Sequence, residues 1–522
     1  MASTILGAFM HLKTITNCNP RTVARKRRKL RRAGIPKRAV MLILAASIAG
    51  CASYAERPEI TPDLYSPAAA DQQWSPVAQQ QPQYHVAAVT QEIAQAASQD
   101  HSTVTGSHYD LPRLIDLALR LNPSTRQSWQ AARSAAASYG IAQAPYYPRV
   151  GFETDAGYNR LLFQVVPGPA VIKQWSVSPM GELTYTLLDF GRRSADSELA
   201  RQELAAANFG FNRTMQTVVY QVQSNYYSLA AAQAAVQAAT ENVDLARTDL
   251  EAVSRRVNLG LATEPALLLA RETEAQAEFQ LESAHTLVND SRAGLAVAVG
   301  VAADEPLEIQ SLDNQPVPKT LGKEVQQLIT EAVRERPDLE AEAAKYRASE
   351  AAVKRSHAEW FPVLTADANY GEQAWWYTFS NSNTIKSASP QYEALLTLRW
   401  DIFTGFSRLD DDRRTEANRK AERESVKSLE IETIAEVWRS YYDFQTAVKK
   451  YQFAQALLAA AQESYNDNLD TYRQGLSTIV ELLTADTALA NARLTMVQST
   501  AELLTSSATV AYAVGAVDMP RR

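Results

Sequence analysis

The chain has 522 residues and a formal net charge of −6, from 52 Lys and Arg against 58 Asp and Glu. Hydrophobic residues make up 46% of the sequence, which excludes a wholly disordered protein. Only two cysteines are present, so a disulfide scaffold and a Cys₄ metal site are excluded. Residues 1–50 hold 11 basic and no acidic residues, and the rest of the chain is too acidic to bind nucleic acid by bulk charge.

The first segment has the pattern of a secretory signal. Ten Lys and Arg lie within residues 21–38, and an apolar run follows at residues 39–49. That run is too short to span a bilayer, which takes about 20 residues, but it suits a signal peptide. It ends in Ile48-Ala49-Gly50-Cys51, which resembles a bacterial lipobox, whose cysteine is lipidated and becomes the mature N-terminus. We expect a lipoprotein signal peptide over residues 1–50 and a covalent lipid on Cys51. The alternative is an ordinary signal peptide with an incidental cysteine.

Residues 51–107 are rich in Pro, Gln, Ser and Ala and show no hydrophobic periodicity. This composition predicts an extended, lipid-anchored linker. An Asp directly after a lipidated cysteine implies retention in the inner membrane. Ala52 stands there in this chain, and it therefore implies the outer membrane.

The rest of the chain repeats itself. Five landmarks recur at a nearly constant offset along the chain: Pro123 with Pro337, Pro148 with Pro362, Gly191 with Gly405, Tyr226-Tyr227 with Tyr441-Tyr442, and Gly260 with Gly475. Such a long period predicts a duplicated domain rather than a solenoid. We expect a first repeat over residues 108–315, a second over 316–515, and a C-terminal tail over 516–522. Each repeat should contain two helices, two strands and a long helical pair.

The helical pairs should be unusually long. Residues 406–514 contain no proline and only one glycine, Gly475, and no proline lies between Gly191 and Pro265. Stretches of this length predict a coiled coil or a helical tunnel. Glycine can end a helix in the left-handed conformation, so we expect two hairpin tips. Their candidate residues are Gly260, Leu261 and Thr263 in the first tip and Gly475, Leu476 and Thr478 in the second, with both threonines as N-caps.

Four segments alternate between apolar and polar residues, as β-strands do: residues ~149–160, ~177–190, ~363–371 and ~391–403. In the alternating stretches the charges fall on one face, and aromatic residues gather near the strand ends. This pattern suits a membrane barrel with lipid outside and water inside. The alternative is a half-buried sheet of a soluble protein. Four strands cannot close a membrane barrel, so a barrel requires an oligomer, and a trimer would supply twelve strands.

Taken together, these motifs resemble the TolC-like outer membrane efflux family over about residues 107–515. The resemblance implies a mainly α fold with a small membrane β-barrel. It implies a homotrimer with a 12-stranded barrel and a long periplasmic α-helical tunnel, with Gly191 and Gly405 at the strand-to-helix junctions. The tips of such trimers dock onto a periplasmic adaptor and an inner-membrane pump. The resemblance also places Glu481 at the pore constriction, with Thr484 where some members carry a second acidic residue. Ser477 and Ala266 stand where some members carry a basic and an acidic residue that lock the tip.

We therefore expect a passive outer-membrane channel that conducts drugs or small solutes. The alternatives are the same channel in type I protein secretion, and a lipid-anchored periplasmic coiled-coil scaffold without a barrel. No motif predicts catalysis, and no His, Cys or Met cluster predicts a metal site or a cofactor beyond the lipid on Cys51. For Glu481 two roles stay open. It could form an acidic ring at the pore, or it could close a capping box with Thr478.

Overall fold

The computed structural model describes residues 71, 109–165, 168–305, 307–310, 317–318, 320–379 and 383–517. The expected signal peptide, Cys51 and nearly all of the 51–107 linker lie outside the described residues. All elements below belong to one unit, Glu59–Arg522.

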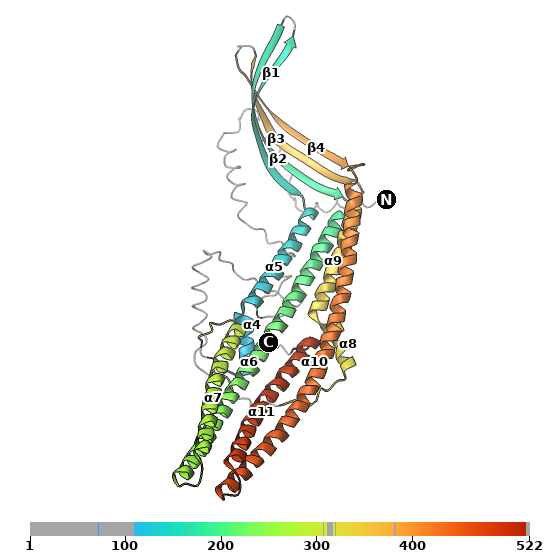
Figure 1. The fold of residues 1–522 in the computed structure, drawn as a ribbon. Helices are drawn as coiled ribbons and strands as arrows, with labels where there is room; N and C mark the ends of the chain where they lie inside the picture. Colours follow the sequence, from blue (N-terminus) through green and yellow to red (C-terminus); the bar gives the residue numbers. More distant parts are fainter. Residues whose placement is uncertain are drawn as a thin grey trace, which may run out of the picture. The chain divides into compact units, whose positions relative to one another are not determined.

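The fold consists of two copies of one helix–helix–strand–strand–helix–helix unit, as the sequence landmarks predicted (Figure 1). The first copy contains α4 (Leu111–Leu121), α5 (Pro123–Gln143), the short 3₁₀ helix η3 (Ala144–Tyr146), β1 (Arg149–Val165), β2 (Gly168–Leu188), α6 (Arg192–Asn258) and α7 (Glu264–Val299). The second contains α8 (Val325–Glu335), α9 (Pro337–Ala358), β3 (Val363–Phe379), β4 (Ile385–Arg399), α10 (Ser407–Arg473) and α11 (Ile479–Val514). Helices α6 and α10 have 67 residues each, and α7 and α11 have 36 each.

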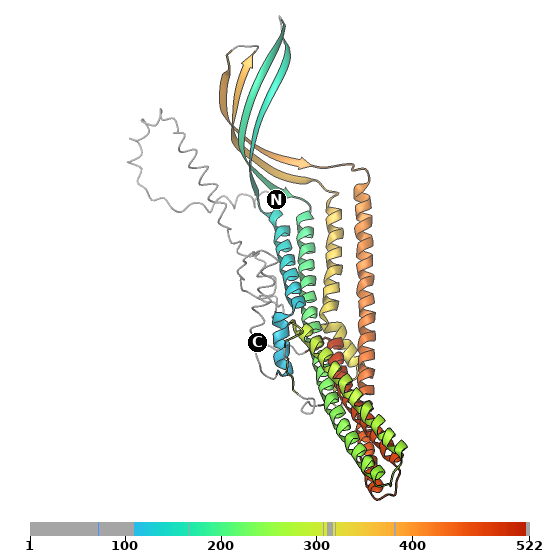
Figure 2. The same cartoon turned by 60° about the vertical axis from the view of Figure 1, so that its left-hand side comes forward.

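The strands form one antiparallel sheet in the order β1-β2-β3-β4. Helices α6 and α10 start at one end of this sheet and run away from it to two hairpin tips, which both views show at the far end (Figures 1 and 2). Four hydrophobic clusters follow the helices of the described residues. They lie around Tyr226, around Phe444, above the tips around Leu482, and between α6 and α7 around Val243.

The predicted starts of β1 and β3 are confirmed, but their ends and both bounds of β2 and β4 were wrong. At the hairpin ends the strands are longer than expected, because β1 and β2 pair up to Val165 and Gly168 and β3 continues to Phe379. At the helix ends β2 and β4 are shorter. Asp189 does not continue β2, because its carboxylate accepts hydrogen bonds from the backbone N of Arg193 at 2.9 Å and from Arg193 Nε at 2.8 Å. The Asp189 carboxylate therefore binds an N–H group in the first turn of α6, as a capping side chain does.

The residue before the first landmark proline of each repeat, Pro123 or Pro337, closes that repeat. Asn122 Nδ2 donates to Ala298 O at 2.8 Å, and Arg336 Nη1 donates to Ala513 O at 3.0 Å. Both acceptors lie at the C-terminal end of a returning helix, whose last carbonyls have no partner within the helix. Each of these helices then ends on a left-handed glycine, Gly300 in α7 and Gly515 in α11.

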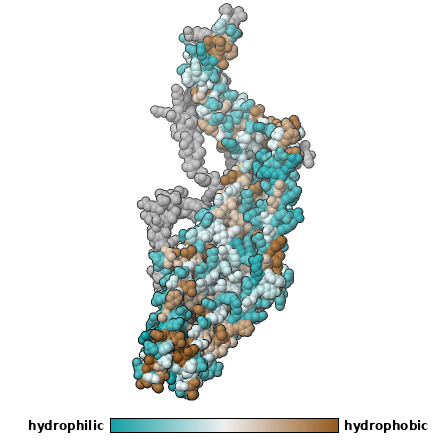
Figure 3. Space-filling view, in the orientation of Figure 1, coloured by the Kyte–Doolittle hydropathy of each residue, from teal (hydrophilic) through white to brown (hydrophobic). Residues whose placement is uncertain are grey.

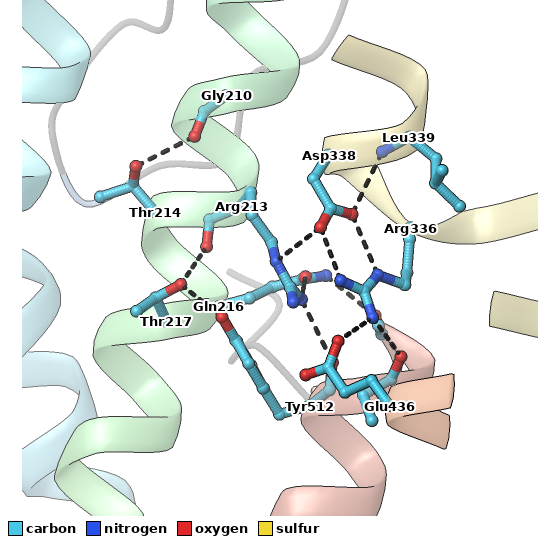
Figure 4. Close-up of polar contacts among 12 residues, drawn as sticks. Gly210, Arg213, Thr214, Gln216, Thr217, Arg336, Asp338, Leu339, Glu436 and Tyr512 are labelled. Carbon is cyan, nitrogen blue, oxygen red and sulfur yellow. Dashed lines mark hydrogen bonds and ion pairs between the residues drawn. The ribbon is translucent and has the colours of Figure 1, made fainter. Parts of the chain in front are cut away.

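The second closure belongs to a partly buried network that joins the two repeats, with Arg336 at its buried centre (Figure 4). It is called here the repeat junction: Arg213, Arg336, Asp338, Glu436 and Tyr512. Arg336 holds Asp338 with two hydrogen bonds, of 3.0 and 2.6 Å, and reaches Glu436 Oε2 at 2.6 Å. Arg213 of α6 lies 3.4 Å from Asp338 Oδ2 and 3.9 Å from the centroid of the Tyr512 ring. Helices α6, α9, α10 and α11 therefore meet in one set of paired charges.

No helix of the described residues is long and apolar enough to cross a lipid bilayer.

The repeat junction makes a prediction about stability. Arg336→Ala should lower the free energy of unfolding by about 3 kcal/mol, because it leaves two carboxylates without their buried partner. Arg334→Ala is the matched control. Its side chain is 77% exposed, and its loss should change stability by less than about 0.5 kcal/mol. Chemical denaturation in detergent measures both, and equal values for the two variants would contradict the prediction.

The same network gives the expected effect of pH. Burial alone would raise the pKa of Asp338, but Arg336 and Arg213 lower it below its ordinary value. A lowered pKa means that this stabilisation is present at neutral pH and is lost as the pH falls below the ordinary value for aspartate.

Candidate functional site

The first tip joins α6 to α7. Gly260 adopts φ 71°, and Leu261 N donates to Arg256 O at 2.8 Å, which closes the last turn of α6 as left-handed glycines do. Thr263 occupies the N-cap position of α7, but its side chain makes no capping hydrogen bond, so that part of the expectation was wrong. The reason is local. Pro265 has no N–H to offer, and the N–H of Ala266 bonds the Thr263 carbonyl instead, at 3.0 Å.

The second tip, between α10 and α11, repeats this backbone. Gly475 adopts φ 77°, and Leu476 N donates to Thr471 O at 2.9 Å. Leu261 and Leu476 are both exposed at the ends of their hairpins. In Figure 3 hydrophobic side chains gather at the lower end of the molecule, where Figure 1 places the tips.

Glu481 and Thr478 form the capping box that the sequence left open. Glu481 Oε2 accepts from Thr478 N at 2.7 Å, and Glu481 N donates to Thr478 Oγ1 at 3.3 Å. The hydrogen bond from the Thr478 backbone lowers the pKa of Glu481, which keeps this exposed side chain negatively charged. Thr484 lies on the same exposed face, and its hydroxyl donates to Val480 O at 2.6 Å.

A contact that the sequence did not predict holds the two tips together. Arg256 of α6 donates from Nη1 to Tyr472 O at 2.8 Å, and its guanidinium lies 4.5 Å from the centroid of the Tyr472 ring. Stacking on an aromatic face adds a cation–π attraction to the hydrogen bond. A side chain from the first repeat therefore binds the last turn of α10 in the second, next to Gly475.

Above the tips, both hairpins contribute to one hydrophobic cluster, called here the tip cluster: Val253, Leu267, Ala270, Ala461, Tyr465, Tyr472, Leu482, Leu483, Ala485, Leu489 and Ala492. Two carboxylates are buried beside it, Asp249 of α6 and Asp486 of α11. Sequence reasoning missed both. A signal was present, because the interval between Asp249 and Gly260 equals the interval between Gly475 and Asp486.

The strand-to-helix junctions lie at the opposite end of the long helices. Gly191 adopts φ 96° and Gly405 φ 62°, and both stand beside a non-glycine residue with positive φ, Phe190 and Phe406. The left-handed turn lets the chain leave β2 and enter α6 abruptly. The Phe190 ring stacks on Phe361 with centroids 5.2 Å apart, so the junction also carries aromatic residues.

One face of the sheet is largely apolar across all four strands, with Glu372 of β3 as a charged exception. The cross-strand register places its residues in rows: Val150–Leu183–Ala368–Ala394, Phe152–Gly181–Tyr370–Tyr392, and Tyr185–Ala366–Leu396. The large side chains of these rows are exposed on β4, Tyr392 to 80% and Leu396 to 71%. The opposite face carries polar rows, such as Gly151–Glu182–Asn369–Glu393 and Thr186–Thr365–Thr397.

The apolar face ends in an aromatic row. Tyr158, Trp175 and Trp376 are cross-strand partners, and the first two rings lie 5.0 Å apart. Beyond this row Arg160 pairs with Lys173 on the same face, and Lys386 stands opposite Trp376. The one-sided charge pattern therefore stops there, because the observed strands continue past the alternating stretches from which it was predicted.

Among the described residues, no group of three or more His, Cys, Asp or Glu is placed to hold a metal ion.

The chain matches the model of the family described as outer membrane efflux protein twice, over residues 114–301 and 328–516. It is similar to Protein CyaE of Bordetella pertussis, with 27% identity over 401 residues, 77% of this chain and 83% of CyaE. It is 24% identical to the pyoverdine export outer membrane protein OpmQ of Pseudomonas aeruginosa over 385 residues, 72% of this chain and 78% of OpmQ. The solved structure of the outer-membrane channel OprN has a TM-score of 0.69 at 17% identity, covering 81% of this chain and 92% of OprN.

The two family matches coincide with the two structural repeats, and OprN shares their fold. The chain belongs to the outer membrane efflux protein family.

Proposed function

We propose that this protein is the outer-membrane channel of a tripartite efflux system and that it works as a homotrimer. The observation that carries the proposal is the sheet, which combines an exposed apolar face with two edge strands, β1 and β4. In lipid each unpaired backbone group costs several kcal/mol. The edges must therefore pair with other strands, and four strands are too few to close a barrel. Three copies supply twelve strands and leave no open edge.

The dimensions of the apolar face suit a bilayer. A membrane-spanning strand needs about 9–11 tilted residues. On β4 the apolar face extends from Ala388 to Leu398, and on β1 from Val150 to Tyr158. The row Tyr158–Trp175–Trp376 and the aromatic pair Phe190–Phe361 lie at its two ends, where interfacial girdles belong. Glu372, opposite Pro390, is a charged residue inside this band, and Arg160, Lys173 and Lys386 lie just outside it.

The helices then form the periplasmic part. They extend from the end of the sheet opposite its hairpin turns, and their tips expose Leu261 and Leu476 for docking by a periplasmic adaptor that is coupled to an inner-membrane pump. Exposed apolar side chains also occur along α10, such as Trp438, Phe453 and Leu457. In a trimer these side chains would be covered by neighbouring helices.

The transported compound is a drug or another small solute. The name of OpmQ, a pyoverdine export protein, supports a small-solute cargo. A scaffold without a membrane sheet no longer fits a member of this family. Protein secretion would use the same channel architecture, and the pump that co-purifies with the full-length protein separates the two roles.

At the N-terminus the proposal keeps the lipid anchor. Cleavage before Cys51 would remove residues 1–50, and residues 51–107 would link the lipidated cysteine to the first repeat. The lipobox-like sequence Ile48-Ala49-Gly50-Cys51 supports this step.

At the tips, three copies of Glu481 would form an acidic ring at the periplasmic mouth, because the side chain is exposed and stays charged.

The membrane sheet is tested by two neighbouring substitutions. Leu396→Arg places a charge on the proposed lipid face, between the middle of the apolar band and its helix end, and should cost about 1–4 kcal/mol. Thr397→Arg places the same charge on the polar face and should be tolerated. The yield of heat-modifiable trimer from outer membranes is the measurement. Equal loss in both variants, or a monodisperse monomer of the wild type, would reject the barrel.

Two substitutions distinguish the acidic-ring role of Glu481 from its capping role. Glu481→Gln keeps the hydrogen bond to Thr478 but removes the charge, so cation selectivity in planar bilayers should fall while the melting temperature stays the same. Thr478→Ala removes the cap and should cost about 1 kcal/mol while selectivity stays the same. Unchanged selectivity in Glu481→Gln would leave the residue with the capping role alone.

The anchor is tested by metabolic labelling. Wild-type protein from cells grown with labelled palmitate should carry the label, and the Cys51→Ser variant should carry none. One acyl chain holds a protein on a membrane only marginally, so several chains are expected. A wild-type protein without label would overturn the assignment.

A further inference from the structure

Asp249 and Asp486 lie at the same height above the two tips. Asp249 precedes Gly260 on α6 by the same interval by which Asp486, on α11, follows Gly475. That interval is about three helical turns, so at a rise of about 1.5 Å per residue each lies roughly 16 Å from its tip along the helix. The two helices belong to different hairpins, so the carboxylates lie where the first repeat packs against the second.

Both carboxyl groups are buried without adequate partners. Asp249 is 1% exposed and Asp486 4%. No described residue gives a hydrogen bond to either carboxylate oxygen of Asp249, or to Oδ1 of Asp486. A buried carboxylate that lacks hydrogen bonds is costly as an anion, and a second anion nearby adds repulsion.

The surrounding groups do not neutralise the pair. From α10 the Tyr465 ring and Arg473 face it, and from α11 Arg493 does. Arg493 is already engaged with Asn242 Oδ1 at 2.9 Å and with Glu241 at 3.5 Å. The part of α7 that enters the tip cluster contributes the apolar Leu267 and Ala270.

These surroundings shift both titrations toward neutral pH. Burial, followed by the charge of Asp486, raises the pKa of Asp249 to about 7 despite the opposing effect of Arg473. Burial raises the pKa of Asp486 to about 6 against the effect of Arg493. Burial and the two carboxylates also raise the pKa of Tyr465, so its hydroxyl stays protonated.

We propose that Asp249 and Asp486 form a proton-binding site that controls how tightly the two hairpins of one protomer pack above their tips. With a proton bound, the pair has lost its repulsion and α6 packs against α11. When the proton leaves, two like charges remain beside an apolar cluster. Separating α6 from α11 admits water and relieves them. A low pH therefore closes the tips and a higher pH loosens them.

The sign follows from linkage. A carboxyl group whose pKa is raised in the folded state stabilises that state below the pKa of the unfolded chain. The stabilisation is lost as the pH rises through the folded values, here about 6 and about 7. The proton site does not depend on the channel role, but its effect on conductance rests on the proposed function.

Hydrogen–deuterium exchange on the full-length protein in detergent tests the site. After correction for intrinsic rates, exchange in residues 479–490 should rise at least about tenfold between pH 5 and pH 8 in the wild type, as expected for a shift of more than one pKa unit. The double variant Asp249→Asn with Asp486→Asn should change less than about twofold, because Asn keeps the shape and loses the charge. Glu251→Gln, on the exposed side of α6, should keep the wild-type response.

The outcomes separate the site from the channel. A wild type without pH response, or a double variant that keeps it, overturns the proton site. If the double variant does not fold, Asp486→Asn alone must reduce the response, and an unchanged response overturns the site in the same way. Planar-bilayer conductance of the wild type should rise over the same pH range. A protein with the exchange response but no conductance in any condition retains the proton site and contradicts the channel role.

Discussion

The contacts made by Asn122 and Arg336, which stand before Pro123 and Pro337, set the relative positions of the long helices. Asn122 binds the end of α7 and Arg336 the end of α11, and both are buried. Because each returning helix is closed at the same level and both have 36 residues, the two tips end at the same height. Arg256 can then reach Tyr472, and Asp249 and Asp486 become neighbours. Two local closures therefore align groups that lie in different halves of the sequence.

The sheet and the helices expose different kinds of side chain. The sheet exposes aromatic and aliphatic side chains on one face, and its edge strands β1 and β4 each pair with one neighbouring strand only. The helices combine exposed polar side chains with narrow apolar contacts. Many of their charges are paired within a turn, across the repeat junction or between neighbouring helices, and Asp249 and Asp486 are exceptions. The aromatic residues near Gly191 and Gly405 lie where the sheet ends and the long helices begin. The left-handed turns there keep the change abrupt.

Much of this architecture could be predicted from the sequence, because long-period landmarks and helix length are local signals. The duplication and the two tips followed from spacing, and the capping box was one of the two roles that the sequence offered for Glu481. The outer halves of the strands did not follow from spacing, since Arg160 and Lys173 stay in the sheet through cross-strand pairing rather than through alternation. The end of β2 was missed because Asp189 caps α6. Arg336 stands directly before the landmark Pro337, but its partners Glu436 and Ala513 come from distant helices, and no spacing rule brings them to it.

The repeat junction lies far from the tips, so a small rotation of a long helix at the junction moves its tip by a much larger distance. From Arg213 to the last residue of α6, Asn258, the helix extends for about 68 Å at a rise of about 1.5 Å per residue. A stiff rod held at that distance amplifies small rotations, and a tilt of about 5° at the junction displaces the tip by about 6 Å. A small rotation of α6 at the repeat junction therefore becomes a displacement of several ångströms at the first tip.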